Sequence, residues 1–222
     1  MREKVYFAWS SGKDSAYALA ELLSEARYEV VGLLSTVTED NKLISTHGIG
    51  IEVLEQQAAA IGLPLEKVYI PGAPSQVQYE RAMKKTLLAF EAQGVTAVAF
   101  GDLFLEDLKE YREKRMAEVG MRALFPLWKM DTKEVAYSFL QRGFQAVITC
   151  VDATVLDGSF AGRRFDEQLL ADIPSSVDPS GENGEFHTFV YEGPIFRRPV
   201  RFQKGGHTVR EGRYHFCEII SL

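Results

Sequence analysis

Strand-like apolar runs alternate with helical patterns along the first two thirds of the sequence, and this alternation constrains the fold most. Runs rich in β-branched and aromatic residues, which are typical of strands, occupy 4–9, 28–37, 66–70, 96–100 and 122–128. Apolar residues at helical spacing between them predict helices over 16–23, 51–61, 79–90 and 105–119. Alternating strands and helices form a parallel sheet with helices on both faces. The sequence therefore predicts an α/β fold.

The sequence pattern changes after residue 128, which predicts a smaller second part. This part contains a helix start at Asp131 and Glu134, a strand over 144–152, a segment rich in glycine, aspartate and serine over 153–184, and a hairpin-like tail over 198–222. We therefore expect two domains, residues 1–128 and an α+β domain over residues 129–222.

Charge and cysteine content argue against several functional classes. The chain of 222 residues carries 31 acidic and 25 basic residues, a net charge of −6, whereas nucleic-acid surfaces are usually basic. Cys150 and Cys217 lie far apart in no CxxC pair, which argues against a disulfide framework and a cysteine zinc site. No signal-peptide pattern and no run of about 18 apolar residues occurs. We expect a cytoplasmic protein with no membrane or nucleic-acid partner.

The loop between the first strand and the first helix has the chemistry of a polyphosphate site. It reads Ser10-Ser11-Gly12-Lys13-Asp14-Ser15. Glycine lets the backbone approach a ligand closely, and the amides at a helix start attract anions. The serines add hydroxyl donors, and Lys13 adds a compact positive charge. It is not a Walker P-loop, because Asp14 follows the lysine and no glycine lies five positions before Gly12.

This loop resembles the pyrophosphate-binding loop SGGKDS of the N-type ATP pyrophosphatases, with Ser11 in place of the first glycine. The resemblance implies a Rossmann-like (HUP-type) fold in which residues 10–15 hold the β- and γ-phosphates of ATP. A substrate oxygen would attack the α-phosphorus, and pyrophosphate would leave. Lys13 and a magnesium ion would neutralise the leaving group. Asp14 would help to hold magnesium or, alternatively, cap the helix.

Two further polar clusters fall at the expected carboxyl ends of strands. These are Ser35–Glu39, which contains Thr36, and Gly101-Asp102. In parallel sheets the carboxyl ends lie at one edge, where α/β folds bind ligands. We therefore expect Thr36 to bind ATP, and Gly101 and Asp102 to bind the substrate. Asp102 is a second candidate magnesium ligand, with a helix cap as the alternative.

A second motif, GENGEFHTFVYEGPIF at 181–196, resembles the signature of the diphthine–ammonia ligase family, a branch of the same superfamily. Further family-like stretches are STHG at 45–48, FGDLFLEDLKEYREKR at 100–115, FPLW at 125–128 and LDGSFAGRRFDE at 156–167. The resemblance covers nearly the whole chain, in order. It implies an ATP-dependent carbon–nitrogen ligase that adenylates a carboxylate on a protein or metabolite and amidates it with ammonia, releasing AMP and pyrophosphate. We leave open whether the protein is a homo-oligomer.

The matched motifs supply the remaining candidate site residues. The expected catalytic residues are Lys13, Asp14 and Glu185, and the expected substrate-binding residues are His47, Gly101, Asp102, Tyr111, Glu182, Glu185 and His187. Either glutamate would bind or deprotonate ammonium, and His187 ionises near neutral pH. Structural alternatives remain: a turn at Asn183-Gly184 with exposed glutamates, a solvated His47, and a charged surface helix around Tyr111 and Arg115.

One stretch departs from the family pattern. Members that make diphthamide, a modification of one archaeal and eukaryotic translation factor, typically carry Tyr-Gln-Arg-x-Arg on this charged helix. This chain reads Tyr111-Arg112-Glu113-Lys114-Arg115 instead. Because we expect this helix to contact the acyl substrate, the departure leaves the identity of that substrate open.

Two other functional classes fit the sequence less well. Sulfur transfer to a tRNA base commonly uses a cysteine persulfide and needs a basic surface, whereas both cysteines are isolated and the chain is acidic. Cys150, at a strand end, is the candidate for that chemistry. A nucleotide-binding sensor, as in the universal stress proteins, would resemble a different glycine-rich phosphate loop. Pyrophosphate release would separate a ligase from a sensor.

Overall fold

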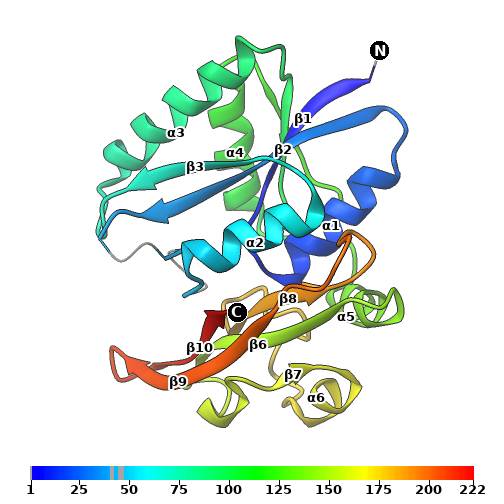
Figure 1. Ribbon diagram of the computed structural model, residues 1–222, viewed down its shortest axis with the longest axis vertical. Coiled ribbons are helices and arrows are strands. Elements are labelled where there is room, and N and C mark those ends of the chain that lie inside the picture. The colour runs from blue at the N-terminus through cyan, green and yellow to red at the C-terminus, as the bar shows by residue number, and fades with distance from the viewer. Residues whose placement is uncertain (1, 41–42, 45–47) are drawn as a thin grey trace.

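The computed structural model describes residues 2–40, 43–44 and 48–222, and Figure 1 shows two stacked parts. The first part is a parallel sheet with the strand order β3-β2-β1-β4-β5. Its strands are β1 (Glu3–Ala8), β2 (Tyr28–Thr38), β3 (Leu65–Ile70), β4 (Ala97–Ala99) and β5 (Arg122–Leu124). The predicted parallel α/β core is confirmed.

Helices cover both faces of this sheet, as predicted. They are α1 (Lys13–Ser24), α2 (Ile51–Ile61), α3 (Gln76–Glu91) and α4 (Glu106–Ala117). Successive residues of a strand point to opposite faces, so Leu33 of β2 packs with α1 and α2, whereas Leu34 packs with α3 and α4. This arrangement leaves the carboxyl ends of the strands open at one edge.

The second part is a smaller antiparallel sheet with short helices. Its strands are β6 (Gln145–Asp152), β7 (Arg164–Phe165), β8 (Phe186–Glu192), β9 (Phe202–Arg210) and β10 (Tyr214–Ser221). The predicted terminal hairpin is confirmed, since β9 and β10 pair antiparallel. The helices are α5 (Thr132–Gln141), α6 (Glu167–Asp172) and the short 3-10 turn η1 (Gly158–Phe160). Asp131 caps α5, its carboxylate accepting from the Glu134 N–H at 3.0 Å.

Helices α1 and α2 lie between the two sheets (Figure 1). α1 packs against β8 and α5, and α2 packs against β10. One apolar cluster contains residues of both parts, among them Leu19, Leu54 and Phe189. The boundary at residue 128 falls between β5 and α5 and stays a prediction.

Two observed boundaries differ from the predicted ones near the site. Residues 10–15 are called the phosphate loop below. Helix α1 begins at Lys13 and not at Ala16, so the end of this loop forms the first turn of the helix. Strand β2 runs to Thr38, because pairing with β3 continues as far as Ile70. Ser35 and Thr36 lie within the strand, as the predicted bounds 28–37 already placed them. The Ser35 hydroxyl donates to the Trp9 carbonyl at 2.6 Å, which ties β2 to the end of β1.

Candidate functional site

A cavity of about 880 Å³ opens at the carboxyl ends of β1, β2 and β4. This volume lies in the range of small-molecule sites. Its walls come from the phosphate loop, residues 34–36 of β2, residues 100–102 after β4, facing sides of α3 and α4, and residues 180–182, 184 and 186–188 of the second part. The predicted convergence of separate polar clusters on one edge is therefore present.

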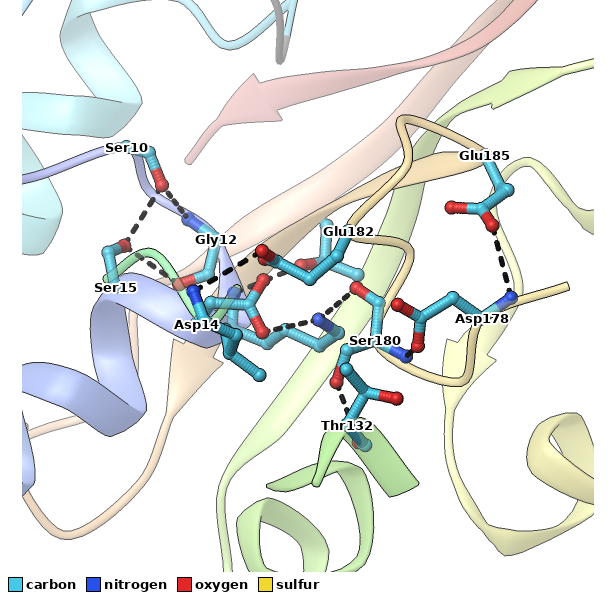
Figure 2. A network of polar contacts seen from close by, with 12 residues as sticks. Ser10, Gly12, Asp14, Ser15, Thr132, Asp178, Ser180, Glu182 and Glu185 are labelled. Atoms are coloured by element: carbon cyan, nitrogen blue, oxygen red, sulfur yellow. Dashed lines mark hydrogen bonds and ion pairs between the residues drawn. The ribbon is translucent and has the colours of Figure 1, made fainter. Parts of the chain in front are cut away.

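The phosphate loop is held from outside by both parts of the chain. The Ser11 carbonyl accepts from the Val190 N–H of β8 at 3.0 Å and from Nε2 of Gln57 on α2 at 3.1 Å. Within the loop, the Ser10 hydroxyl donates to the Ser15 hydroxyl, which donates to the Gly12 carbonyl, each at 3.0 Å (Figure 2). These contacts fix the backbone turn before any ligand arrives.

Lys13 is buried, with 2% of its side chain exposed, and the second part of the chain holds it. Its Nζ donates to Oδ1 of Asp14 at 2.6 Å and to the Ser180 carbonyl. Its backbone N–H donates to the Thr188 hydroxyl at 3.0 Å. Figure 2 shows the chain of contacts from Asp14 through the lysine to Ser180. Lys13, the cation of the phosphate loop, thus contacts residues of both predicted domains.

Three carboxyl groups, those of Asp14, Asp102 and Glu182, line the same cavity as this lysine. The pKa of Glu182 is raised to about 7, first by burial and then by the charges of Asp14 and Asp102, while Lys13 opposes the rise. Burial also raises the pKa of Asp14, with Lys13 opposing. Asp102 is raised in pKa by burial as well, with Arg112 opposing. A carboxyl that titrates near neutral pH suits proton transfer.

Glu185 lies apart from these groups. It is 6% exposed, does not line the cavity, and uses both oxygens within its own loop. It accepts from the Asp178 N–H at 3.1 Å, and from the N–H and Nδ2 of Asn183 at 3.0 Å each. Figure 2 shows Glu182 beside the phosphate loop and Glu185 directed at Asp178. The alternative of an exposed glutamate is wrong for Glu185, and its predicted catalytic role stays a prediction.

The cavity is also lined by four other predicted site residues, namely Thr36, Gly101, Tyr111 and His187. Burial, and then the charge of Lys13, lower the pKa of His187 to about 4, so the expectation that it ionises near neutral pH is wrong. The prediction for His47 falls outside the described residues.

Gly101 allows a close approach of two backbones. A Cβ at this position would lie 3.0 Å from the Ser15 nitrogen and 3.1 Å from the carbonyl carbon of Asp14. Such contacts are too tight for a side chain without a shift of backbone. The end of β4 therefore sits directly on the first turn of α1.

Comparison with known proteins gives the family. Residues 3–123 match the diphthamide synthase N-terminal domain, and residues 131–219 match the diphthamide synthase C-terminal domain. The chain belongs to the diphthamide synthase family. The two matched ranges adjoin the predicted boundary at residue 128, and together they contain the phosphate loop and the second motif.

Curated relatives of this family member are named diphthine–ammonia ligase. The protein from Schizosaccharomyces pombe is 26% identical over 222 residues, covering 89% of this chain and 36% of the relative. The proteins from Rattus norvegicus and Homo sapiens are each 23% identical over 214 residues, covering 86% of this chain and 79% of each relative. The chain thus spans little more than a third of the fission yeast relative.

Magnesium fits this family member's site only together with a nucleotide. Within residues 2–40, 43–44 and 48–222, no cluster of three or more His, Cys, Asp or Glu side chains could hold a metal ion. Magnesium is commonly bound by one or two carboxylates plus substrate phosphates. Asp14 lies in the phosphate loop, where its Oδ1 accepts from Lys13, and it could supply one such carboxylate. The carboxylate of Asp102 is paired with Arg112. Both magnesium assignments stay predictions.

Several residues of the site were not predicted. Gln57 is buried on α2 and bridges Nε1 of Trp9 at 3.0 Å, the Ser11 carbonyl and the Val190 carbonyl. A glutamine between the apolar positions Leu54 and Ala58 was the available sequence signal. Ser180 was not predictable, because it acts through its backbone carbonyl.

Cys150 does not support sulfur transfer. It is buried within β6, and burial raises the pKa of its thiol to about 11. Reactive cysteines have a lowered pKa and are partly exposed, since the thiolate is the nucleophile.

Proposed function

We propose that this protein is an ATP-dependent amide-forming ligase that adenylates a carboxylate and amidates it with ammonia. The observation that carries the proposal is that the phosphate loop and Glu182 of the second motif line one cavity. Membership in the diphthamide synthase family and the name of its curated relatives support the same reaction class. Diphthine is the proposed carboxylate substrate.

In the first step, a carboxylate oxygen attacks the α-phosphorus of ATP, and the bond to the pyrophosphate oxygen breaks. Residues 10–15 and the first turn of α1 present hydroxyls, amides and Lys13 to the leaving pyrophosphate. Lys13 reaches the phosphates by exchanging the Ser180 carbonyl for a phosphate oxygen. Magnesium held by Asp14 would add positive charge to the pyrophosphate.

In the second step, ammonia attacks the acyl carbon, and AMP leaves as the carbon–oxygen bond breaks. The new amine carries an extra proton, which must be removed. We assign this proton to Glu182, whose pKa of about 7 leaves a large basic fraction at neutral pH. Glu185 positions Glu182 by holding the turn at Asn183.

The proposed partners are ATP, ammonia from solution and the carboxylate substrate, and the proposed location is the cytoplasm. In the described ranges, no helix is long and apolar enough to cross a bilayer. Oligomeric state does not enter the mechanism, because each step uses residues of one chain.

The test is an incubation with ATP, magnesium, ammonium chloride and a diphthine-bearing translation factor from fission yeast cells that lack their own ligase. AMP and pyrophosphate in equal amounts, with the carboxylate converted to an amide by mass spectrometry, are the expected products. ADP with phosphate, or ATP that is bound but not consumed, would contradict the ligase. AMP formed only when a small-molecule extract replaces the translation factor would retain the reaction and overturn diphthine as the substrate.

A further inference from the structure

The side of the cavity formed by α3 and α4 ends in an ion pair beside the phosphate loop. Nε of Arg112 lies 2.9 Å from Oδ2 of Asp102, and its Nη2 donates to Oδ1 at 3.2 Å. Both residues line the cavity. Only the second contact is a hydrogen bond, since Nε of Arg112 and Oδ2 of Asp102 have no hydrogen-bond partner among the described residues. Asp102 therefore neutralises the guanidinium but does not complete the two-bond fork by which arginine recognises a carboxylate.

Arg112 is fixed in place yet reachable from the cavity. Its guanidinium carbon lies 4.2 Å from the centroid of the buried Phe100 ring, which supports it from below. Its side chain is 27% exposed, whereas that of Asp102 is 12% exposed. A ligand entering the cavity therefore meets the guanidinium more readily than its carboxylate partner.

The ion pair is adjacent to the proposed reaction centre. Asp102 follows Gly101, whose backbone rests on the first turn of α1 at Asp14 and Ser15. The charge of Asp102 also raises the pKa of Glu182. A carboxylate bound to Arg112 in place of Asp102 would lie next to both the phosphate loop and the proposed base.

We propose that Arg112 binds the carboxylate of the acyl substrate, and that Asp102 occupies the same guanidinium as a placeholder until that substrate arrives. The inference rests on the proposed function and adds a substrate-recognition residue to it. Arg112 is a positioning residue that delivers the carboxylate, and the chemistry remains with the groups around Lys13.

A placeholder has a physical purpose at this position. A partly buried arginine without a counter-ion is costly, and Asp102 removes that cost in the ligand-free protein.

The experiment uses acetate as the simplest carboxylate probe. Binding of ¹³C-labelled acetate to the full chain is measured by NMR titration for wild type, D102N, R112Q and K109Q. Lys109 is a matched control, because it lies on α4 less than one turn before Arg112, pairs with Glu113 and does not line the cavity. Melting temperatures establish that each variant is folded.

D102N should bind acetate about tenfold more tightly than wild type, because asparagine cannot neutralise the arginine fork. R112Q should lose this binding, and K109Q should behave as wild type. A gain of affinity in D102N cannot arise from structural damage. Acetate binding that is no tighter in D102N than in wild type, or that persists in R112Q, would overturn the inference.

A second readout separates this inference from the proposed function. In the AMP-forming assay, R112Q should raise KM for the diphthine-bearing factor about tenfold and leave KM for ATP unchanged. Parallel changes of both KM values would contradict a carboxylate-specific role. Acetate binding as expected without any AMP formation by wild type would overturn the proposed function alone. AMP formation with unaltered acetate binding in D102N and R112Q would overturn the placeholder alone.

Discussion

Ser11 adopts a backbone conformation that favours glycine. Its φ is 78°, and it is a buried residue whose hydroxyl has no hydrogen-bond partner among the described residues. A left-handed conformation costs a residue with a Cβ about 1 kcal/mol or more, and a buried unpaired hydroxyl adds to that cost. The serine that replaces the first glycine of the loop pattern is therefore strained.

Replacing Ser11 with glycine should stabilise the protein. Relief of the strain and loss of the unpaired hydroxyl outweigh the extra freedom of glycine in the unfolded chain, for a net gain of about 1 kcal/mol. The melting temperature should rise by roughly 2–4 °C, measured by scanning calorimetry. S11A is the control, since it removes the hydroxyl and keeps the strained φ, and it should gain less. A lower melting temperature for S11G would contradict the assignment of strain.

Glu182 should give the reaction its pH dependence. Its pKa of about 7 means that the basic form accumulates as pH rises, so the rate of amide formation should increase up to pH about 7 and then level off. E182Q should lose this rise and about 100-fold of the rate, while binding of ATP is retained. The measurement is the pH profile of amide formation at saturating ATP. A profile in E182Q that matches wild type would remove Glu182 from proton transfer.

The same pKa shift carries a stability consequence with a defined sign. Between the ordinary value of 4.5 and about 7, folded Glu182 binds its proton more tightly than the unfolded chain does. Stability therefore falls as pH rises through this window. A group that destabilises the fold when charged, and lies at a cavity wall, is typical of functional sites.

At the level of elements, the turn over residues 178–185 connects the second motif to the phosphate loop. Glu185 holds this turn through three accepted hydrogen bonds, and the Ser180 carbonyl within it accepts from Lys13. Loss of Glu185 should thus act on ATP binding through the turn.

E185A should lower the free energy of unfolding by about 1–3 kcal/mol, because it removes three partly buried hydrogen bonds to a charged acceptor. It should also raise KM for ATP, since the turn that holds Lys13 loosens. Urea unfolding and ATP titrations measure the two effects. The matched control is E167Q at the exposed first turn of α6, which should change neither quantity. An unchanged KM for ATP in E185A would contradict the claim that this turn affects ATP binding.

Sequence patterns located the elements well and their polar ends less well. The helical spacing of Ala16 and Leu19 marks the buried face of α1, but the polar first turn at Lys13 carries no such spacing. The strand predicted over 28–37 is one residue shorter than β2, because pairing with β3, which a single sequence does not display, continues to Thr38. For the same reason the charged run at Arg112 read as a surface helix, although its guanidinium pairs with Asp102 inside the cavity.

At the scale of the whole molecule, the site exists only where the two parts meet. Lys13 contacts Ser180 and Thr188 of the second part, and Gln57 joins α2 to β8 through the Val190 carbonyl. The apolar cluster around α1 and α2 continues into the second sheet. Alternating strands and helices predicted the first part, but no local pattern predicts which face of it the second part covers.

The shared core predicts that the two parts unfold together. Both tryptophans, Trp9 and Trp128, lie in residues 1–128, and both cysteines, Cys150 and Cys217, lie in residues 129–222 and are buried. Tryptophan fluorescence and a brief pulse of thiol labelling in urea therefore report on different parts. Their midpoints should coincide, because separating the parts would expose the apolar faces of α1 and α2.

The Q57A variant provides a second test of whether the two parts unfold together. It removes the hydrogen bonds of Gln57 to Nε1 of Trp9 and to the Ser11 and Val190 carbonyls, which should cost about 2–4 kcal/mol. In a single cooperative unit both midpoints shift by the same amount. If the fluorescence midpoint falls while the thiol midpoint stays, the second part is stable without the first, and the prediction of a single cooperative unit is wrong.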